Sequence, residues 1–179
     1  STNTLLSRAA CLGMDLRAHV AEGRVRVHQV DPAELSPGEF AHAVRGAVEN
    51  QGATIVVIDS LNGYLQSVPE ETYLGHAGVA TILIGAHQGV IGPSMSTPVD
   101  ASYLADAVVL MRYYETKGEV RQAISVVKKR GGAHERSIRE FGLTNDGIRV
   151  GPALRAFRGI LTGTPIFEGA EPQRANRSD

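Results

Sequence analysis

The sequence predicts an α/β protein in which a mostly parallel sheet, flanked by helices, is followed by antiparallel hairpins. Two apolar runs without alternation, Thr54–Ile58 and Val79–Ile84, are typical of strands buried on both faces of a parallel sheet. Turn signals interrupt the apolar stretches after Ala107, and this spacing is typical of hairpins. The 179 residues are enough for one domain with a substantial core.

The composition argues against several classes of protein. The net charge of -1 at pH 7 does not indicate a strongly basic nucleic-acid binder. No apolar run approaches the roughly 20 residues of a membrane span, and no signal peptide is recognisable. The single cysteine, Cys11, excludes an internal disulfide and indicates a reducing, cytoplasmic location. Its apolar helical surroundings predict a buried side chain.

The first fifty residues predict three helices and one strand. An apolar stripe predicts a helix over Ser1–Leu12, stopped by glycine, and Asp15 is positioned to cap a short second helix. Alternation over Val25–His28 predicts a strand with one solvated side. Ser36–Glu39 has the serine, proline and glutamate of a capping box, so the third helix begins there and runs towards Gly52.

The connection between the two apolar runs, residues 61–78, is poorly suited to the helix that a parallel crossover usually contains. Glycine and proline interrupt it, and only Glu70–Leu74 has a helical pattern. We therefore expect either an unusually poor crossover or residues missing from the sequence near Leu74/Gly75.

The second half of the chain predicts strands that reverse direction at each turn. The expected strands and turns, in chain order, are Ala107–Tyr114, Lys117–Gly118, Ala123–Lys128, Gly131–Gly132, Ser137–Leu143 and Asn145–Gly147. The parallel part of the fold therefore gives way to antiparallel hairpins.

The central apolar run ends in a carboxylate and a hydroxyl, Asp59 and Ser60. Ligands of open α/β sheets collect at the carboxyl ends of the strands, and an acid there can hold Mg²⁺ beside a nucleotide phosphate. The alternative is that one of the two side chains caps the next helix. The run by itself leaves both interpretations open.

The second candidate cluster consists of Lys128, Arg130 and His134. Alternation directs Lys128 and Arg130 to the same side of a strand end, and it directs Lys129 to the other side. Two cations on one face can hold phosphate oxygens, and arginine supplies a planar fork. The alternative is a solvated hairpin end.

The histidines have no metal-ligand spacing with each other or with the cysteine, so no zinc site is expected. His87–Gln88 follows the second apolar run and could contact a phosphate or water, or simply begin a loop. No nucleophile elbow is present for Ser-His-Asp chemistry.

Together these pieces resemble the RecA-like ATPases of P-loop NTPase type, and more closely the KaiC family of bacterial and archaeal clock and signalling ATPases. The closest resemblance is to the second, autokinase-type domain of the circadian clock members. The stretches that carry it are Ile55–Leu61, which is similar to a Walker B strand, then Asp106–Phe141, and finally Phe157–Pro165. It implies one RecA-like domain over residues 1–167, followed by a polar tail over residues 168–179.

The resemblance implies that ATP and Mg²⁺ bind between neighbouring subunits of a hexameric ring. Asp59 is then the Walker B acid near the metal, and Ser60 and Gln88 are nearby candidates for nucleotide contact. Lys128, Arg130 and His134 are expected to reach the nucleotide of the adjacent subunit. Cations fixed beforehand stabilise charge that develops on the γ-phosphate.

Ser102–Tyr103 stands where the clock members carry a phosphorylated Ser-Thr pair, so Ser102 is a candidate autophosphorylation site. Because tyrosine replaces threonine, the match to a two-site cycle is partial. A loop serine before a strand is the alternative interpretation.

Two features of the family are missing from the sequence. A P-loop requires Gly-x-x-x-x-Gly-Lys-Ser/Thr, but no lysine precedes Lys117. The paired catalytic glutamates expected before Ser1 are also not in this sequence. The simplest expectation is that residues are missing at the start and near Leu74/Gly75, and a polypeptide of this sequence alone is not expected to bind ATP well.

Three functions follow from the sequence. The first is an ATPase, and a candidate serine autokinase, that acts in an oligomeric ring for signalling or timing. The second is a catalytically inactive scaffold with the same fold. The third, a DNA recombination or repair ATPase, is disfavoured by the near-zero net charge and by the 5% aromatic content without tryptophan.

Overall fold

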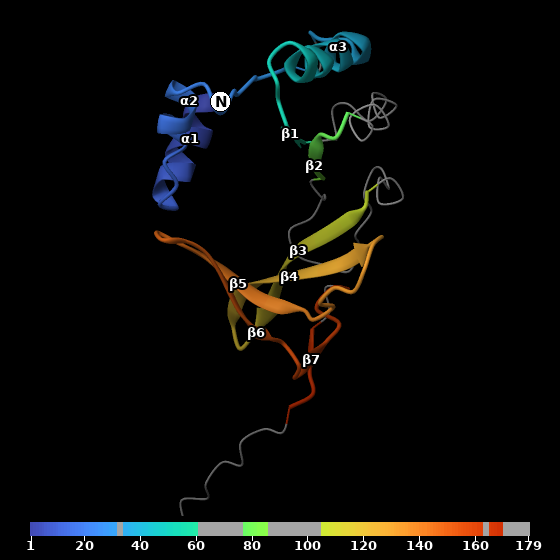
Figure 1. Ribbon diagram of the computed structural model, residues 1–179. Helices are drawn as coiled ribbons and strands as arrows, with labels where there is room; N and C mark the ends of the chain where they lie inside the picture. Colours follow the sequence, from blue (N-terminus) through green and yellow to red (C-terminus); the bar gives the residue numbers. More distant parts are fainter. Residues whose placement is uncertain (32–33, 61–76, 86–104, 163–164, 170–179) are drawn as a thin grey trace, which may run out of the picture. The chain divides into compact units, whose positions relative to one another are not determined.

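The computed structural model describes residues 1–31, 34–60, 77–85, 105–162 and 165–169 (Figure 1). The chain divides into two compact units. Among the described residues, the first unit holds the three helices and strands β1 and β2. The second holds strands β3 to β8, apart from the turn at residues 145–147. Each unit is described by itself.

Helix α1 (Thr2–Cys11) begins at Ser1, whose side chain accepts a hydrogen bond from the Thr4 amide. Leu6 and Ala9 are its buried side chains. The prediction of a buried Cys11 is wrong, because this thiol is exposed. It stands two positions after Ala9, a rotation of about 200° around the helix, which directs it away from the buried stripe.

Helix α2 (Leu16–Ala21) begins at Asp15, whose Oδ1 accepts from the Ala18 amide at 3.1 Å, as predicted. The strand predicted over Val25–His28 is not formed, and these residues have no regular secondary structure. Arg26 donates instead to the side chain of Gln51 at 3.2 Å. Alternation describes a pattern of exposure, but a strand also needs a partner with which to form a ladder of hydrogen bonds.

Helix α3 (Pro37–Glu49) has the predicted capping box. Ser36 Oγ accepts from the Glu39 amide at 3.3 Å, and the Glu39 carboxylate accepts from the Ser36 amide at 2.9 Å. The hydrogen bonds from the side chain and then the backbone of Ser36 lower the pKa of Glu39. The cap therefore satisfies donors that the first turn of the helix leaves without a partner.

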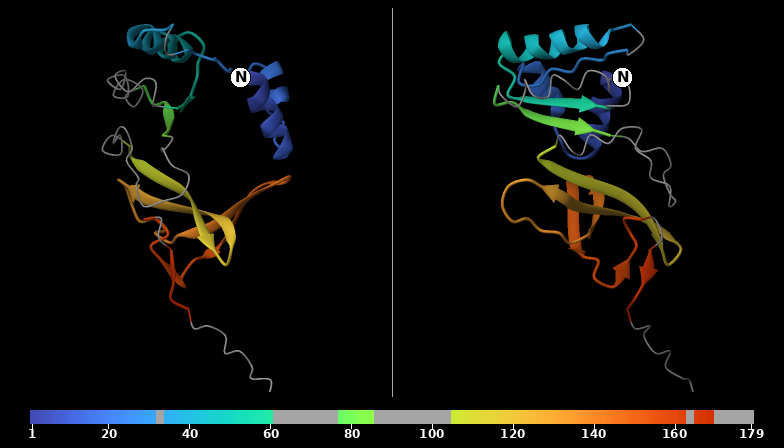
Figure 2. Two further views of the ribbon diagram at one scale, coloured as in Figure 1. Left: turned by 180° about the vertical axis from the view of Figure 1, so that it is seen from behind. Right: turned by 90° about the vertical axis from the view of Figure 1, so that its right-hand side faces the viewer.

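Strands β1 (Ile55–Asp59) and β2 (Ala80–Ile84) pair in parallel, with Ile55 opposite Ala80 and Asp59 opposite Ile84. The predicted parallel pairing is confirmed. The prediction that both faces are buried is wrong, since Ile55 is 61% exposed and Ile82 is 52% exposed. Alternate residues are half-buried, and Figure 2 shows α3 running alongside the pair. This two-stranded sheet thus has one open face in the described structure.

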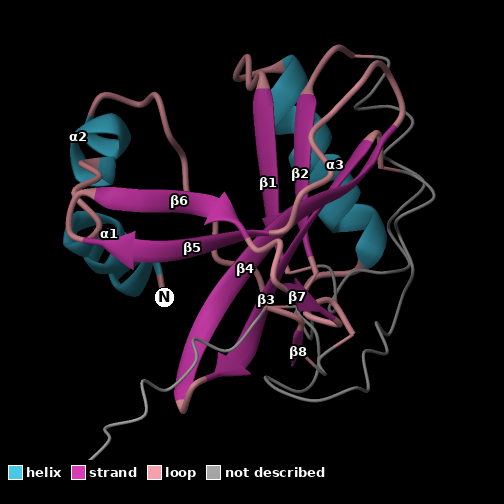
Figure 3. Cartoon of the chain, turned by 90° about the horizontal axis from the view of Figure 1, so that it is seen from below, coloured by secondary structure: helices cyan, strands magenta, loops and turns pink. Residues whose placement is uncertain are grey.

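The second unit contains a four-stranded sheet in the order β3-β4-β5-β6. Strand β4 pairs antiparallel with both β3 and β5, and Figure 3 shows the long β3–β4 hairpin. The bounds are β3 Ala107–Thr116, β4 Glu119–Lys129, β5 Arg139–Thr144 and β6 Gly147–Ala153. The predicted succession of hairpins is confirmed, although β4 begins earlier and β5 later than expected.

The β3–β4 turn consists of Lys117 at φ 51° and Gly118 at φ 73°. Two successive residues with positive φ are the signature of a type I′ turn, whose twist matches that of the flanking strands. The turn predicted at these two residues is confirmed.

The core of the second unit consists of Tyr114, Ala123 and Ile160, with Ile138, Leu154 and Phe157 packed against it. The short strands β7 (Phe157–Arg158) and β8 (Ile166–Phe167) form a separate antiparallel pair. The rings of Tyr114 and Phe157 lie edge to face with centroids 6.1 Å apart. Phe157 of β7 thereby packs against the core.

Several predictions fall on residues outside the described part of the chain. These are the crossover, including the missing residues expected near Leu74/Gly75, and the candidate site residues His87–Gln88 and Ser102. In the described part, no helix is long and apolar enough to cross a membrane.

Candidate functional site

The first candidate residue, Asp59, is the last residue of β1 and is exposed. Its parallel neighbour β2 ends directly opposite, at Ile84. Ser60 follows, half-buried. The carboxylate thus stands at the carboxyl edge of a parallel pair, which is the edge where α/β proteins bind ligands. The alternative interpretation, that one of the two side chains caps a following helix, concerns residues outside the described part of the chain.

The basic cluster lies at the end of β4 in the other unit. Lys128 stands opposite Val108, and Lys129 stands opposite Ala107. The ladder continues past the last assigned pair, because the Arg130 amide donates to the Asp106 carbonyl at 2.7 Å. Opposite residues of an antiparallel pair point to the same face. Lys128 and Arg130 therefore share one face, and Lys129 points to the other.

A bulge immediately before the cluster determines which face this is. Val109 pairs with Val126 but Val108 pairs with Lys128, so Val127 is an extra residue in β4. An extra residue shifts the alternation of everything that follows it. Lys128 consequently shares the face of the buried Ser125, and without the bulge it would point to the opposite side.

The Arg130 side chain has an acidic partner directly across the hairpin. Its Nη1 donates to Asp106 Oδ1 at 3.3 Å. The sequence analysis did not single out Asp106. Counting back from the Lys117–Gly118 turn with uniform alternation would place Lys129 opposite Asp106 instead. Predicting that Asp106 stands opposite Arg130 would have required knowledge of the bulge. The apolar run Ile124–Val127 does not indicate a bulge.

His134 lies in the irregular segment between β4 and β5 and is half-buried. Its Nε2 is buried and has no hydrogen-bond partner among the described residues. An imidazole nitrogen in this state is able to accept or donate one further bond. Gln88 and Ser102 lie outside the described residues.

The residues present fit a nucleotide with Mg²⁺, although no group of three or more His, Cys, Asp or Glu side chains that could hold a metal occurs in the described ranges. Mg²⁺ at nucleotide sites is usually bound through one or two carboxylates together with phosphate oxygens and water. Asp59 can supply one carboxylate, and Lys128 and Arg130 can supply cations for phosphates. Within its own unit, each of these donors suits contact with a nucleotide or its Mg²⁺ better than a closed metal cage.

An open pocket in the second unit does not contain these residues. It lies where the β3–β4 turn meets the C-terminal segment and is lined by Tyr113, Tyr114, Glu115, Thr116, Lys117, Phe157, Pro165 and Phe167. None of the candidate site residues lines it. Half of the lining residues are aromatic, and we assign the pocket no part in the candidate site.

The chain is similar to a known family of ATPases. The family model for the KaiC ATPase matches residues 1–155. The circadian clock protein KaiC3 of Synechocystis sp. is 26% identical over 177 residues, which cover 93% of this chain and 35% of that protein. The circadian clock oscillator protein KaiC of Thermostichus vulcanus is 27% identical over 171 residues, covering 89% of this chain and 33% of that protein.

The corresponding KaiC of Synechococcus elongatus is 24% identical over 171 residues, covering 90% of this chain and 33% of that protein. The chain therefore spans about a third of the length of these curated relatives. The match to the family model extends over most of the 179 residues. The chain belongs to the KaiC family of ATPases.

Proposed function

We propose that this chain is part of an ATPase that hydrolyses ATP with Mg²⁺ in an oligomeric ring of KaiC type. Membership of an ATPase family implies nucleotide binding. The observation that carries the proposal is the shared face of Lys128 and Arg130 at the end of β4, with Lys129 directed away. A pair of cations held by a strand is suited to bind phosphate oxygens.

In this proposal Asp59 holds the metal, directly or through water. A carboxylate at the carboxyl end of β1 can accept hydrogen bonds from the water shell of Mg²⁺ or coordinate it. The bound metal would neutralise charge on the β- and γ-phosphates. Ser60, adjacent in sequence, and Gln88 are further candidates for contact with the nucleotide.

Lys128 and Arg130 act in this proposal on a nucleotide held by the neighbouring subunit, with His134 as a third contact. The fork of Arg130 can donate two parallel hydrogen bonds to phosphate, and Lys128 adds a compact positive charge. Supplying these cations in trans couples hydrolysis to assembly of the ring. A hexamer is the ring expected from the family.

The finer features of the proposal concern the whole protein. They are one RecA-like domain over residues 1–167 with a polar tail over residues 168–179, a cytoplasmic location, and a role in signalling or clock-type timing. We also propose that Ser102 is autophosphorylated in the whole protein. A P-loop and a pair of catalytic glutamates are further features that the resemblance to the family implies. Protein partners of the signalling role are expected to bind the assembled ring.

The experiment that tests the proposal measures ATP turnover by the full-length protein carrying Arg130→Ala. A catalytic arginine supplied in trans contributes about 10³-fold or more, so we expect a loss of this order in kcat. Lys129→Ala is the matched control, because it removes the neighbouring cation on the opposite face and is expected to leave turnover near wild type. Equal turnover by wild type and Arg130→Ala, or equal losses in both variants, would contradict the proposal.

A further inference from the structure

Asp106 and Arg130 are joined twice across the start of the β3–β4 hairpin. The Arg130 amide donates to the Asp106 carbonyl at 2.7 Å, and Arg130 Nη1 donates to Asp106 Oδ1 at 3.3 Å. The backbone hydrogen bond holds the two residues opposite each other. The side-chain hydrogen bond therefore forms between two side chains whose Cα positions are already set by the strand pairing. This juxtaposition depends on the bulge at Val127, without which Lys129 would stand opposite the carboxylate.

The exposure of the pair argues against a role in stability. The side chain of Arg130 is 56% exposed and that of Asp106 is 87% exposed. Ion pairs with this exposure contribute little to the free energy of unfolding, because water screens them and ordering two side chains costs entropy. What the carboxylate can do is restrict the orientations of a long, flexible guanidinium.

We propose that Asp106 is a positioning residue that orients Arg130 for contact with the nucleotide of the neighbouring subunit. The inference rests on the proposed function, in which Arg130 acts on that nucleotide. Guanidinium has donors on three nitrogens, so it can bind a carboxylate through one nitrogen and phosphate through others. Asp106 itself touches no reacting atom and acts only through Arg130.

A preoriented arginine does not have to lose rotamer freedom when the transition state forms. The benefit therefore appears in kcat rather than in the KM for ATP. The restraint supplied by one exposed ion pair corresponds to a rate change of about two- to fivefold. Neutralising Asp106 should therefore cost much less than deleting Arg130.

The test measures ATP turnover by the full-length protein with Asp106→Asn, Asp106→Glu, Arg130→Ala and the double variant Asp106→Asn/Arg130→Ala. We expect Asp106→Asn to lower kcat about two- to fivefold with little change in KM. Asp106→Glu should recover part of the loss, because it keeps the charge. The double variant should match Arg130→Ala alone, since a residue that acts through Arg130 has no effect in its absence.

Glu168→Gln is the matched control. It removes the carboxylate of another exposed pair in the same unit, in which Arg158 Nε lies 2.9 Å from Glu168 Oε1. We expect its turnover to equal that of wild type. If Asp106→Asn also lowers the thermal midpoint, its effect on turnover is compared in the wild-type and Arg130→Ala proteins. A general loss of folding reduces turnover by the same factor in both, whereas loss of the positioning role reduces it only when Arg130 is present.

The outcomes separate the two proposals. Wild-type turnover in Arg130→Ala would remove the trans-acting role on which both rest. A large loss in Arg130→Ala with no change, or a gain, in Asp106→Asn would overturn the positioning role alone. The positioning role would also be overturned if Asp106→Asn lowered turnover by the same factor in the wild-type and Arg130→Ala proteins.

Discussion

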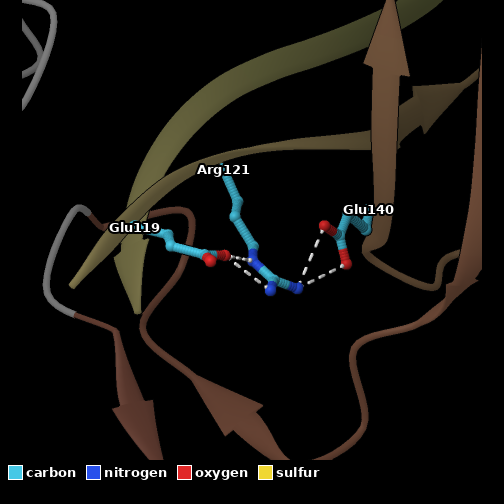
Figure 4. A network of polar contacts seen from close by, with 3 residues as sticks. All are labelled: Glu119, Arg121 and Glu140. Atoms are coloured by element: carbon cyan, nitrogen blue, oxygen red, sulfur yellow. Dashed lines mark hydrogen bonds and ion pairs between the residues drawn. The ribbon is translucent and has the colours of Figure 1, made fainter. Parts of the chain in front are cut away.

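Tyr114 on β3 lies directly opposite Arg121 on β4, and Arg121 bridges two carboxylates (Figure 4). Arg121 Nη1 is 3.3 Å from Glu140 Oε1, and Arg121 Nη2 is 2.8 Å from Glu119 Oε2. The tyrosine ring is buried while the ion network is partly exposed. Arg121 thus links the β3–β4 hairpin to β5 through Glu140, on the face of the sheet that also carries Tyr114.

This arrangement predicts a loss of stability at alkaline pH. Burial raises the pKa of Tyr114, the charge of Glu140 raises it further, and Arg121 opposes them. A folded-state pKa above the unfolded value of 10.0 means that the native state keeps its proton where the unfolded chain releases it. The contribution is complete below pH 10 and is lost as pH rises through the folded-state pKa.

The measurement is denaturant unfolding between pH 8 and about pH 11 for wild type and Tyr114→Phe. We expect the stability advantage of wild type over the variant to shrink above pH 10. Comparing the two proteins cancels the titration of the other tyrosines. A constant difference across this range would contradict the assignment to Tyr114.

Ser36→Ala should destabilise the first unit. The serine hydroxyl accepts from the Glu39 amide, and loss of an N-cap side chain costs about 1 kcal/mol. Circular dichroism during urea unfolding measures the loss. Ser36→Thr is the matched control, since threonine keeps the hydroxyl that accepts from the Glu39 amide and contacts its carboxylate, and it should retain most of the stability. Equal losses in both variants would show that the cap is not the cause.

Gly118→Ala should weaken the β3–β4 hairpin. Gly118 has φ 73°, a conformation that costs a residue with a Cβ roughly 1 kcal/mol. Gly46→Ala in α3 is the control, because the new methyl makes only an ordinary contact with Asn50 and alanine favours helix. Urea unfolding should show destabilisation for the first variant and no loss for the second; the reverse order would contradict the type I′ turn.

Ile160→Ala should be the most destabilising of these substitutions. Its side chain is 0% exposed in the core with Tyr114 and Ala123, and truncating a buried isoleucine costs about 2–5 kcal/mol. Ile148→Ala, at a position that is 58% exposed, should cost far less. Similar thermal midpoints for the two variants would place Ile160 outside the core.

Asp59→Asn should weaken Mg²⁺-dependent hydrolysis by the full-length protein. The amide keeps the shape of the side chain but removes the charge that favours a divalent cation. We expect a loss of about tenfold or more in turnover at limiting Mg²⁺, partly recovered as Mg²⁺ is raised. Asp15→Asn, at a helix cap where asparagine is equally suitable, is the control. Hydrolysis by Asp59→Asn at the wild-type rate for all Mg²⁺ concentrations would remove Asp59 from the metal site.

Features set by neighbouring residues were predictable from the sequence. The capping box at Ser36 and Glu39, the N-cap at Asp15 and the turn at Lys117–Gly118 each depend on contacts within a few positions of the chain. The physical chemistry of such contacts is the same in any fold, so the residue types suffice to predict them.

The predictions that failed depended on partners far along the chain. The strand expected at Val25–His28 needed a neighbour that it does not have in the described structure, and the exposure of Cys11 depends on which side of α1 is covered. An apolar run such as β1 is compatible with one covered face or two. Local sequence cannot distinguish these cases, because burial is a property of what packs against a residue.

The pattern of residues along the chain was enough to predict the helices, the apolar strands, the hairpin turn and the charged residues Asp59, Lys128 and Arg130. Tertiary structure alone decided that Arg130 would stand opposite Asp106. One extra residue, Val127, shifts the register of the hairpin and changes the partner of every residue beyond it. The reason is that a ladder of backbone hydrogen bonds joins distant segments as a whole, so its register is set by the pairing of two strands and not by either strand alone.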